Sequence, residues 1–174
     1  MGVLSDSLFR IELLLEKGGI VLWLILIASL LMWALIVERY YFLFLIYPAR
    51  LRQFLGQWQQ RQDRQSWYAQ RIREGMVAEI SVSLHRFLLL IKTLAAVLPM
   101  LGLLGTVMGM IQVFDVMTVF GTGNARGFAG GISIALITTM AGLVTALSGL
   151  YFSANLEHRV QRAIQYTSDS LRRE

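Results

Sequence analysis

Three long runs of apolar residues restrict what this chain can fold into. The runs cover about residues 20–37, 93–114 and 128–153, and none contains an Asp, Glu, Lys, Arg or His. Each approaches or exceeds the roughly 20 residues that a helix rising about 1.5 Å per residue needs to cross a bilayer. Within lipid, a single span can pair all its backbone N–H and C=O groups only as a helix. The sequence therefore predicts an all-α integral membrane protein with three transmembrane helices.

The composition agrees with this fold class and excludes several kinds of site. Charged residues make up 16% of the chain, whereas soluble domains carry about 25%. The chain has no cysteine, and its two histidines, His85 and His158, are isolated. Disulfides are thus excluded, and no metal, cofactor or catalytic residue is predicted. No phosphate-binding glycine loop with a following Lys is present, so the chain is not expected to be an enzyme.

The polar stretches between the runs set the expected domain organisation. Residues 1–19 carry regularly spaced Leu and Ile on one helical face and predict an amphipathic helix in the membrane interface, with a frayed terminus as the alternative. A cleaved signal peptide is not expected, because the following run is too long and its flank is acidic. The first span with its cytoplasmic extension covers 20–46, and a cytoplasmic helical segment follows over 47–92. The second span covers 93–114, a periplasmic loop 115–127 and the third span 128–153. A cytoplasmic C-terminal helix is expected over 154–174.

Basic residues predict the orientation in the membrane. Nine lie between Arg39 and Lys92 and four follow the third span, against two before the first span and Arg126 alone in the loop. Cytoplasmic segments carry the excess of Lys and Arg, so the N-terminus and the loop are expected outside. Glu38 and Arg39 then mark the cytoplasmic boundary of the first span, and Asp115 the periplasmic boundary of the second. Basic residues that flank apolar runs favour contact with the lipid bilayer, and no nucleic-acid partner is expected.

Small residues recur on one face of the second and third spans. In lipid, close packing of small residues does much of the work of holding helices together. We therefore expect both faces to pack tightly, either on each other or between copies of the protein. The predicted packing residues are Gly102, Gly105 and Gly109 in the second span and Gly131, Ala135, Thr138, Gly142, Thr145 and Gly149 in the third.

Threonines are the main polar groups at depth in the spans. Thr106 lies in the second span, and Thr138, Thr139 and Thr145 lie in the third. A single Thr in a membrane helix usually bonds its own backbone, but several at similar depth also fit a polar surface. Proton relays through a membrane generally need a titratable group at depth. If this protein moves protons, the carboxylate has to come from another chain.

Two sequence stretches and one span boundary resemble a known family. PMLGLLGTVMG at 99–109, ALITTMAGLVTAL at 135–147 and VERYYFL at 37–43 are similar to motifs of the ExbB/TolQ/MotA proton-channel family, and most like its compact ExbB members. The first motif is quite specific, and the other two are weak alone. Some members carry a Glu five residues before the pore Thr, where this chain has Ile134, so a mechanism that protonates that Glu does not apply here.

The resemblance implies a multi-pass protein of the bacterial inner membrane. It implies a homo-oligomer, a pentamer in the family, whose pore holds an ExbD-like single-span subunit that supplies the proton-accepting Asp. By motif position, Thr106 and Thr139 would be pore hydroxyls near that Asp. A TonB-like protein would carry the output to outer-membrane transport. The alternatives are a TolQ-like subunit of the Tol-Pal envelope system and a structural oligomeric scaffold without proton coupling.

Overall fold

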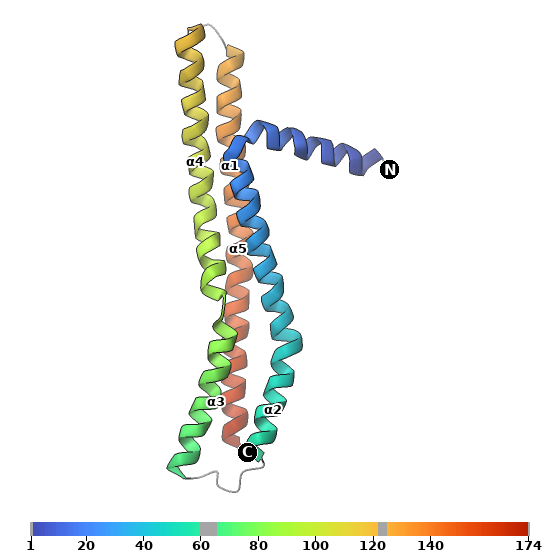
Figure 1. Ribbon diagram of the computed structural model, residues 1–174, viewed down its shortest axis with the longest axis vertical. Helices are drawn as coiled ribbons and strands as arrows, with labels where there is room; N and C mark the ends of the chain where they lie inside the picture. Colours follow the sequence, from blue (N-terminus) through green and yellow to red (C-terminus); the bar gives the residue numbers. More distant parts are fainter. Residues whose placement is uncertain (1, 60–65, 122–124, 174) are drawn as a thin grey trace. The chain divides into compact units, whose positions relative to one another are not determined.

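The computed structural model describes residues 2–59, 66–121 and 125–173, and every element in these ranges is helical (Figure 1). Three helical stretches in the described ranges are long and apolar enough to cross a membrane, which confirms the predicted all-α class. The elements are α1 (Gly2–Tyr41), the π-helical turn η1 (Phe42–Ile46), α2 (Tyr47–Gln59), α3 (Trp67–His85), α4 (Leu88–Phe120) and α5 (Ala125–Arg173).

The chain forms two compact units that divide the long helices. One comprises residues 1–33 and 93–150 and holds most of the three apolar runs. We refer to it as the apolar unit. The other comprises residues 34–92 and 151–174, which contain most of the charged residues, and we refer to it as the polar unit.

In the apolar unit, α4 and α5 run antiparallel with their backbones close together (Figure 1). The contact depends on glycine. A Cβ at Gly142 would lie 2.7 Å from Leu98 O and 3.0 Å from the Cα of Gly102. At Gly109, a Cβ would lie 2.6 Å from Gly131 O. Real Cβ atoms do not approach neighbours this closely, so any larger side chain at these positions would push the two helices apart.

The buried face of α5 follows the turn of a straight helix. Its buried residues are Gly131, Ala135, Thr138, Gly142, Ala146, Gly149, Ser153, Leu156, Val160 and Thr167. Thr145, expected in this stripe, is only half-buried, and Ala146 takes the buried place with 2% of its surface exposed. The reason is that a helix of about 3.6 residues per turn drifts from a strict seven-residue repeat. The buried face is therefore shifted by one residue at this point, from Thr145 to Ala146.

Helix α1 joins the apolar unit through its own buried face. Val21, Leu22, Ile25 and Met32 are buried, and a Cβ at Gly149 of α5 would overlap the sulfur of Met32. The backbone of α1 is helical from Gly2 but changes direction at Gly19, where φ is 64°. A positive φ is readily adopted only by glycine. The kink separates residues 2–18 from the first span. The amphipathic pattern predicted for 1–19 lies mainly on residues whose side chains are outside the described part of the structure.

The loop expected over 115–127 is shorter than predicted. Helix α4 continues to Phe120 and α5 begins at Ala125, so both ends of the expected loop are helical. Residues 115–120 contain no Gly or Pro to stop the helix. Gly121 ends it instead, with φ 70° and an N–H that donates to Met117 O at 3.0 Å. A left-handed glycine of this kind is a common helix terminator.

The helix that contains the first span and its extension continues past Pro48. The π-helical turn η1 widens the helix just before this residue, and Tyr47 N–H donates to Phe42 O, five residues back. A proline inside a regular α-helix collides with the carbonyl four residues earlier. A wider turn ahead of Pro48 relieves that collision, so the chain passes from η1 into α2 without a break.

In the polar unit, α2 and α3 pack through an aromatic contact. Trp58 and Ala69 are 2% and 3% exposed and form a small core with Leu55, Met76 and Val77. Ser66 caps α3 by accepting a hydrogen bond from Ala69 N–H at 3.2 Å. Two residues then separate α3 from α4, and Phe87 between them has φ 64°. For an aromatic residue this conformation is strained.

The contact between α4 and α5 gives a direct test of the packing. Gly142→Ala is expected to destabilise the protein by about 1–3 kcal/mol, because the new methyl group overpacks the helix contact. Gly130→Ala is the matched control on the same helix, since a Cβ there meets nothing within 4 Å. Alanine favours a helix by up to about 1 kcal/mol over glycine, so the control should be neutral or stabilised. Thermal unfolding in detergent measures both, and equal behaviour of the two variants would contradict the packing.

Candidate functional site

The two threonines assigned to a pore by resemblance occupy different surroundings in the apolar unit. The hydroxyl of Thr139 on α5 lies 2.9 Å from Ala135 O on its own helix and 3.2 Å from Gly102 O on α4. The hydroxyl of Thr106 on α4 donates to Leu103 O at 2.6 Å. Both residues are half-buried, and no hydrogen bond joins the two hydroxyls in the described structure. Thr139 thus bridges α4 and α5, whereas Thr106 bonds its own helix.

The other predicted packing residues lie on the α4–α5 contact, apart from Thr145 and from Gly149, which packs mainly against Met32 of α1. A Cβ at Gly105 would overlap the side chain of Thr138, and a Cβ at Gly131 would lie 2.7 Å from Gly109 O. Thr138 is fully buried, and its hydroxyl lies 2.9 Å from Ile134 O on its own helix. Thr145 donates in the same way to Ala141 O at 2.7 Å. Both side chains therefore satisfy their hydroxyls on the α5 backbone.

Large apolar side chains cover the faces of α4 and α5 that point away from this contact. On α4 the exposed residues include Met100, Leu103, Leu104, Val107, Met108, Ile111 and Phe114. On α5 they include Ile132, Leu136, Met140, Leu143, Val144 and Leu147. Exposed apolar area of this extent marks contact with a membrane or with other protein. Lipid or further chains must cover it.

The predicted boundary residues differ in burial. Asp115 is exposed on α4, less than two turns before the end of that helix. Arg39 is only 6% exposed, and its guanidinium donates to Ser83 O of α3 at 3.2 Å and to the Glu38 carboxylate at 3.1 Å. The Arg39 guanidinium carbon also lies 4.8 Å from the centre of the Phe42 ring. Arg39 therefore connects the end of α1 to α3 within the polar unit.

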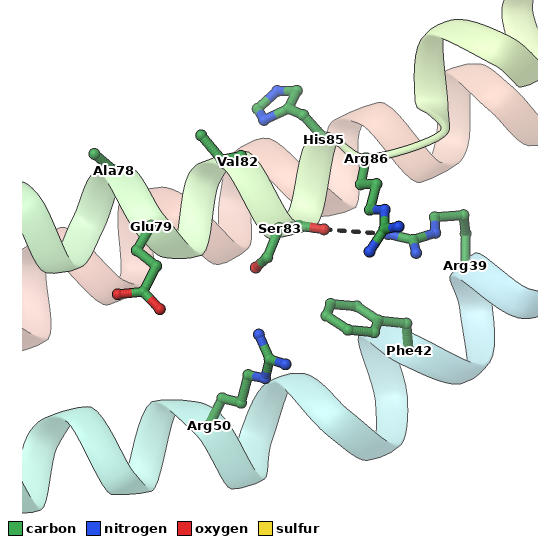
Figure 2. Close-up of a pocket in the computed structure, with 9 residues that line it drawn as sticks. All are labelled: Arg39, Phe42, Arg50, Ala78, Glu79, Val82, Ser83, His85 and Arg86. Carbon is green, nitrogen blue, oxygen red and sulfur yellow. Dashed lines mark hydrogen bonds between the residues drawn. The ribbon is translucent and has the colours of Figure 1, made fainter.

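A cleft of about 910 Å³ opens beside Arg39 in the polar unit (Figure 2). Arg39 and Phe42 line one side with Arg50 of α2, and Ser83 and Arg86 line the other. The remaining lining residues are Ala78, Glu79, Val82 and His85. In the sequence, these arginines count only among the basic residues that predict orientation, and Arg39 also marks a predicted span boundary. Their spacing along the chain does not predict that they line one cleft, because this depends on how α2 packs against α3. We refer to this site as the basic cleft.

An ion pair joins α4 and α5 in the polar unit. Lys92 Nζ lies 2.7 Å and 2.8 Å from the two carboxylate oxygens of Glu157. Glu157 follows the predicted third span, 128–153, by one turn. The hydrogen bond from Lys92 lowers the pKa of the Glu157 carboxyl from its ordinary value, and partial burial opposes this shift. Among the described residues, no group of three or more His, Asp or Glu side chains is placed to hold a metal ion.

Comparison with known proteins adds a family to this geometry. The model of the MotA/TolQ/ExbB proton channel family matches residues 48–169, well over half of the chain. An ExbB-like 3 biopolymer transport protein of Synechocystis is 46% identical over 72 residues, which cover 40% of this chain and 34% of that protein. The biopolymer transport protein ExbB of Aquifex aeolicus is 34% identical over 70 residues, which cover 40% of this chain and 47% of that protein. The chain therefore aligns with less than half the length of either relative, and no solved structure matches it.

The Lys92–Glu157 pair predicts a pH-dependent stability. Because the folded pKa of Glu157 is lowered, the pair stabilises the protein above the unfolded value near 4.5 and loses this effect as the pH falls through the folded pKa. Glu157→Gln should lower stability by up to about 1 kcal/mol at pH 7, since both groups are partly exposed. The difference from the unaltered protein should shrink below pH 4.5 in thermal unfolding.

Glu74→Gln is the control for this prediction, because Glu74 pairs with Arg71 on the exposed surface of one helix, α3. Its effect at pH 7 should be smaller than that of Glu157→Gln. A Glu157→Gln difference that stays constant from pH 7 down to pH 3 would contradict the assignment.

Proposed function

This chain belongs to the MotA/TolQ/ExbB proton channel family, and from that premise we propose that it is an ExbB-like subunit of an inner-membrane complex driven by the proton-motive force. Three helices suited to cross a membrane and the family match over 48–169 support a proton-channel type of subunit. The finer proposal is that the chain energises transport at the outer membrane together with partner proteins.

The observation that carries this proposal is the absence of acidic, basic and histidine side chains from the predicted spans. Residues 20–37, 93–114 and 128–153 contain no Asp, Glu, His, Lys or Arg. A proton crossing the bilayer needs a group at depth that can bind and release it. In a proton channel family, a member without such a group needs the carboxylate of a partner. We propose that an ExbD-like single-span subunit supplies an Asp for this purpose.

The geometry of α4 and α5 fits a pore wall built from several copies. Their small residues lie in the contact between the two helices, and the faces that point away from this contact are apolar and exposed. A homo-oligomer, pentameric as the family resemblance implies, would cover part of these faces and leave part to lipid. The half-buried Thr106 and Thr139 are then the hydroxyls proposed to lie near the partner's Asp.

The output of such a complex would pass to a TonB-like protein. The names of the relatives refer to biopolymer transport, and this favours the ExbB-like role over a TolQ-like role in the Tol-Pal envelope system. A structural oligomeric scaffold is the alternative from another class. It would need no partner carboxylate and would give no coupled proton flux.

The proposed pore hydroxyls give a test in cells. Thr106→Val and Thr139→Val keep the side-chain shape and remove one hydroxyl each. TonB-dependent uptake, measured in cells whose only copy carries the variant, should fall by about tenfold for loss of one working hydrogen bond. The oligomer should keep its native size on gel filtration.

Thr138→Val is the matched control for this test. Its hydroxyl is fully buried and bonds the α5 backbone, so uptake should remain close to that of the unaltered protein. Normal uptake in both the Thr106 and the Thr139 variant would refute the pore-hydroxyl assignment. An equal loss in the Thr138 variant would show a general effect of removing any hydroxyl and would refute it too.

A further inference from the structure

We propose that the basic cleft binds the phosphate of an anionic phospholipid headgroup. Figure 2 shows the Arg86 side chain extending from the end of α3 close to Arg39 of α1, with Arg50 pointing into the cleft from α2. Arginine guanidinium groups present several N–H donors in a flat fork that matches phosphate oxygens. The cleft therefore offers the geometry that phosphate recognition uses.

The positive charges of the cleft are only partly compensated. Glu79 is the one carboxylate among the lining residues, against three guanidinium groups. In the described part of the chain, neither Arg50 nor Arg86 lies within 4.0 Å of a carboxylate oxygen, and Glu38 is the only one that pairs with Arg39. Like charges brought together near a surface repel. A bound anion would be attracted to all three guanidinium groups, so this arrangement favours an anionic ligand.

Aromatic rings fix the positions of these arginines. The guanidinium carbons of Arg39 and Arg50 lie 4.8 Å and 5.8 Å from the centre of the Phe42 ring. Those of Arg39 and Arg86 lie 5.2 Å and 4.9 Å from the centre of the Phe87 ring. Arg39 is thus shared between the two rings. This arrangement holds three cations near one another before any ligand arrives.

Two further features single out this cleft. The Nε of Arg39 is buried and has no hydrogen-bond partner, although a buried polar atom without one is costly. Phe87, whose ring lies beside Arg39 and Arg86, has the strained positive φ of 64°. Strain of this kind persists where the surrounding structure enforces it, and it concentrates at binding sites. Both features are explained if the local structure is built to hold a ligand.

The place of the cleft along the chain favours a lipid as the source of the phosphate. Arg39 follows the uncharged run 20–37 by only one residue, so the cleft lies at the predicted membrane boundary. Nearby residues of the polar unit expose large apolar side chains, among them Tyr41, Phe44, Leu45 and Leu89. Acyl chains could cover these side chains while the headgroup occupies the cleft. The charge asymmetry predicts that this boundary faces the cytoplasmic leaflet, whose anionic lipids attract basic segments.

This inference does not depend on proton coupling. It requires only that the polar unit adjoin the bilayer at the end of the first span. A lipid held between α2 and α3 would fix the position of these helices relative to the membrane surface. The proposal therefore stands or falls separately from the proposed function.

The test measures binding to the full chain purified in a non-ionic detergent. Phosphatidylglycerol, phosphatidylcholine and inorganic phosphate are titrated separately, and the unfolding temperature reports binding, because a ligand that prefers the folded state raises it. Phosphatidylglycerol should raise the unfolding temperature, whereas phosphatidylcholine and inorganic phosphate should not. Arg50→Gln and Arg86→Gln should each weaken phosphatidylglycerol binding by about tenfold, the expected loss of one charge-assisted contact. Both side chains are exposed, so these variants should fold.

Two further variants make the result specific. Arg162→Gln removes the same charge from an exposed position on α5 that does not line the cleft, and it should bind as the unaltered protein does. Glu79→Gln removes the opposing carboxylate and should strengthen binding. Unchanged affinity in the Arg50 and Arg86 variants, or an equal loss in Arg162→Gln, would overturn the proposal. Equal stabilisation by phosphatidylcholine or by inorganic phosphate alone would overturn the assignment to an anionic headgroup.

Discussion

The close contact between α4 and α5 is the constraint on which the rest of the apolar unit depends. At Gly109 and Gly142 the two backbones approach so closely that a single methyl group would collide with the facing helix. In lipid, this packing replaces the hydrophobic effect as the main source of helix association. It fixes which residues of each helix point inward, and it leaves the large apolar side chains on the outside. The same contact carries the hydroxyl of Thr139 to the backbone of α4.

The chain separates its apolar and charged groups along its length. The predicted spans carry no Asp, Glu, His, Lys or Arg, whereas the polar unit gathers arginines at the basic cleft and joins α4 to α5 through Lys92 and Glu157. A chain arranged in this way can build the wall of a proton path but cannot supply its proton acceptor. The proposed division of labour, with a partner carboxylate inside a pore made by this family member, follows from that separation.

Much of the fold could be predicted from the sequence, because long uncharged runs leave a membrane chain few choices other than helix. Glycine spacing pointed to the face of α5 that packs on α4, but a seven-residue repeat placed Thr145 where Ala146 is buried. The length of α4 beyond Asp115 could not be predicted, since residues 115–120 suit a loop or a helix and Gly121 decides the end. The meeting of Arg39, Arg50 and Arg86 could not be predicted, because it depends on tertiary packing of α2 and α3.

Proton flux through liposomes tests the central claim most directly. The chain is reconstituted alone, with its ExbD-like partner, and with a partner whose membrane Asp is changed to Asn, and internal pH is followed after a proton gradient is imposed. The account predicts flux only with the unaltered partner, because only then is a titratable group present at depth. Equal flux from the chain alone would contradict the claim that its proton acceptor comes from another protein.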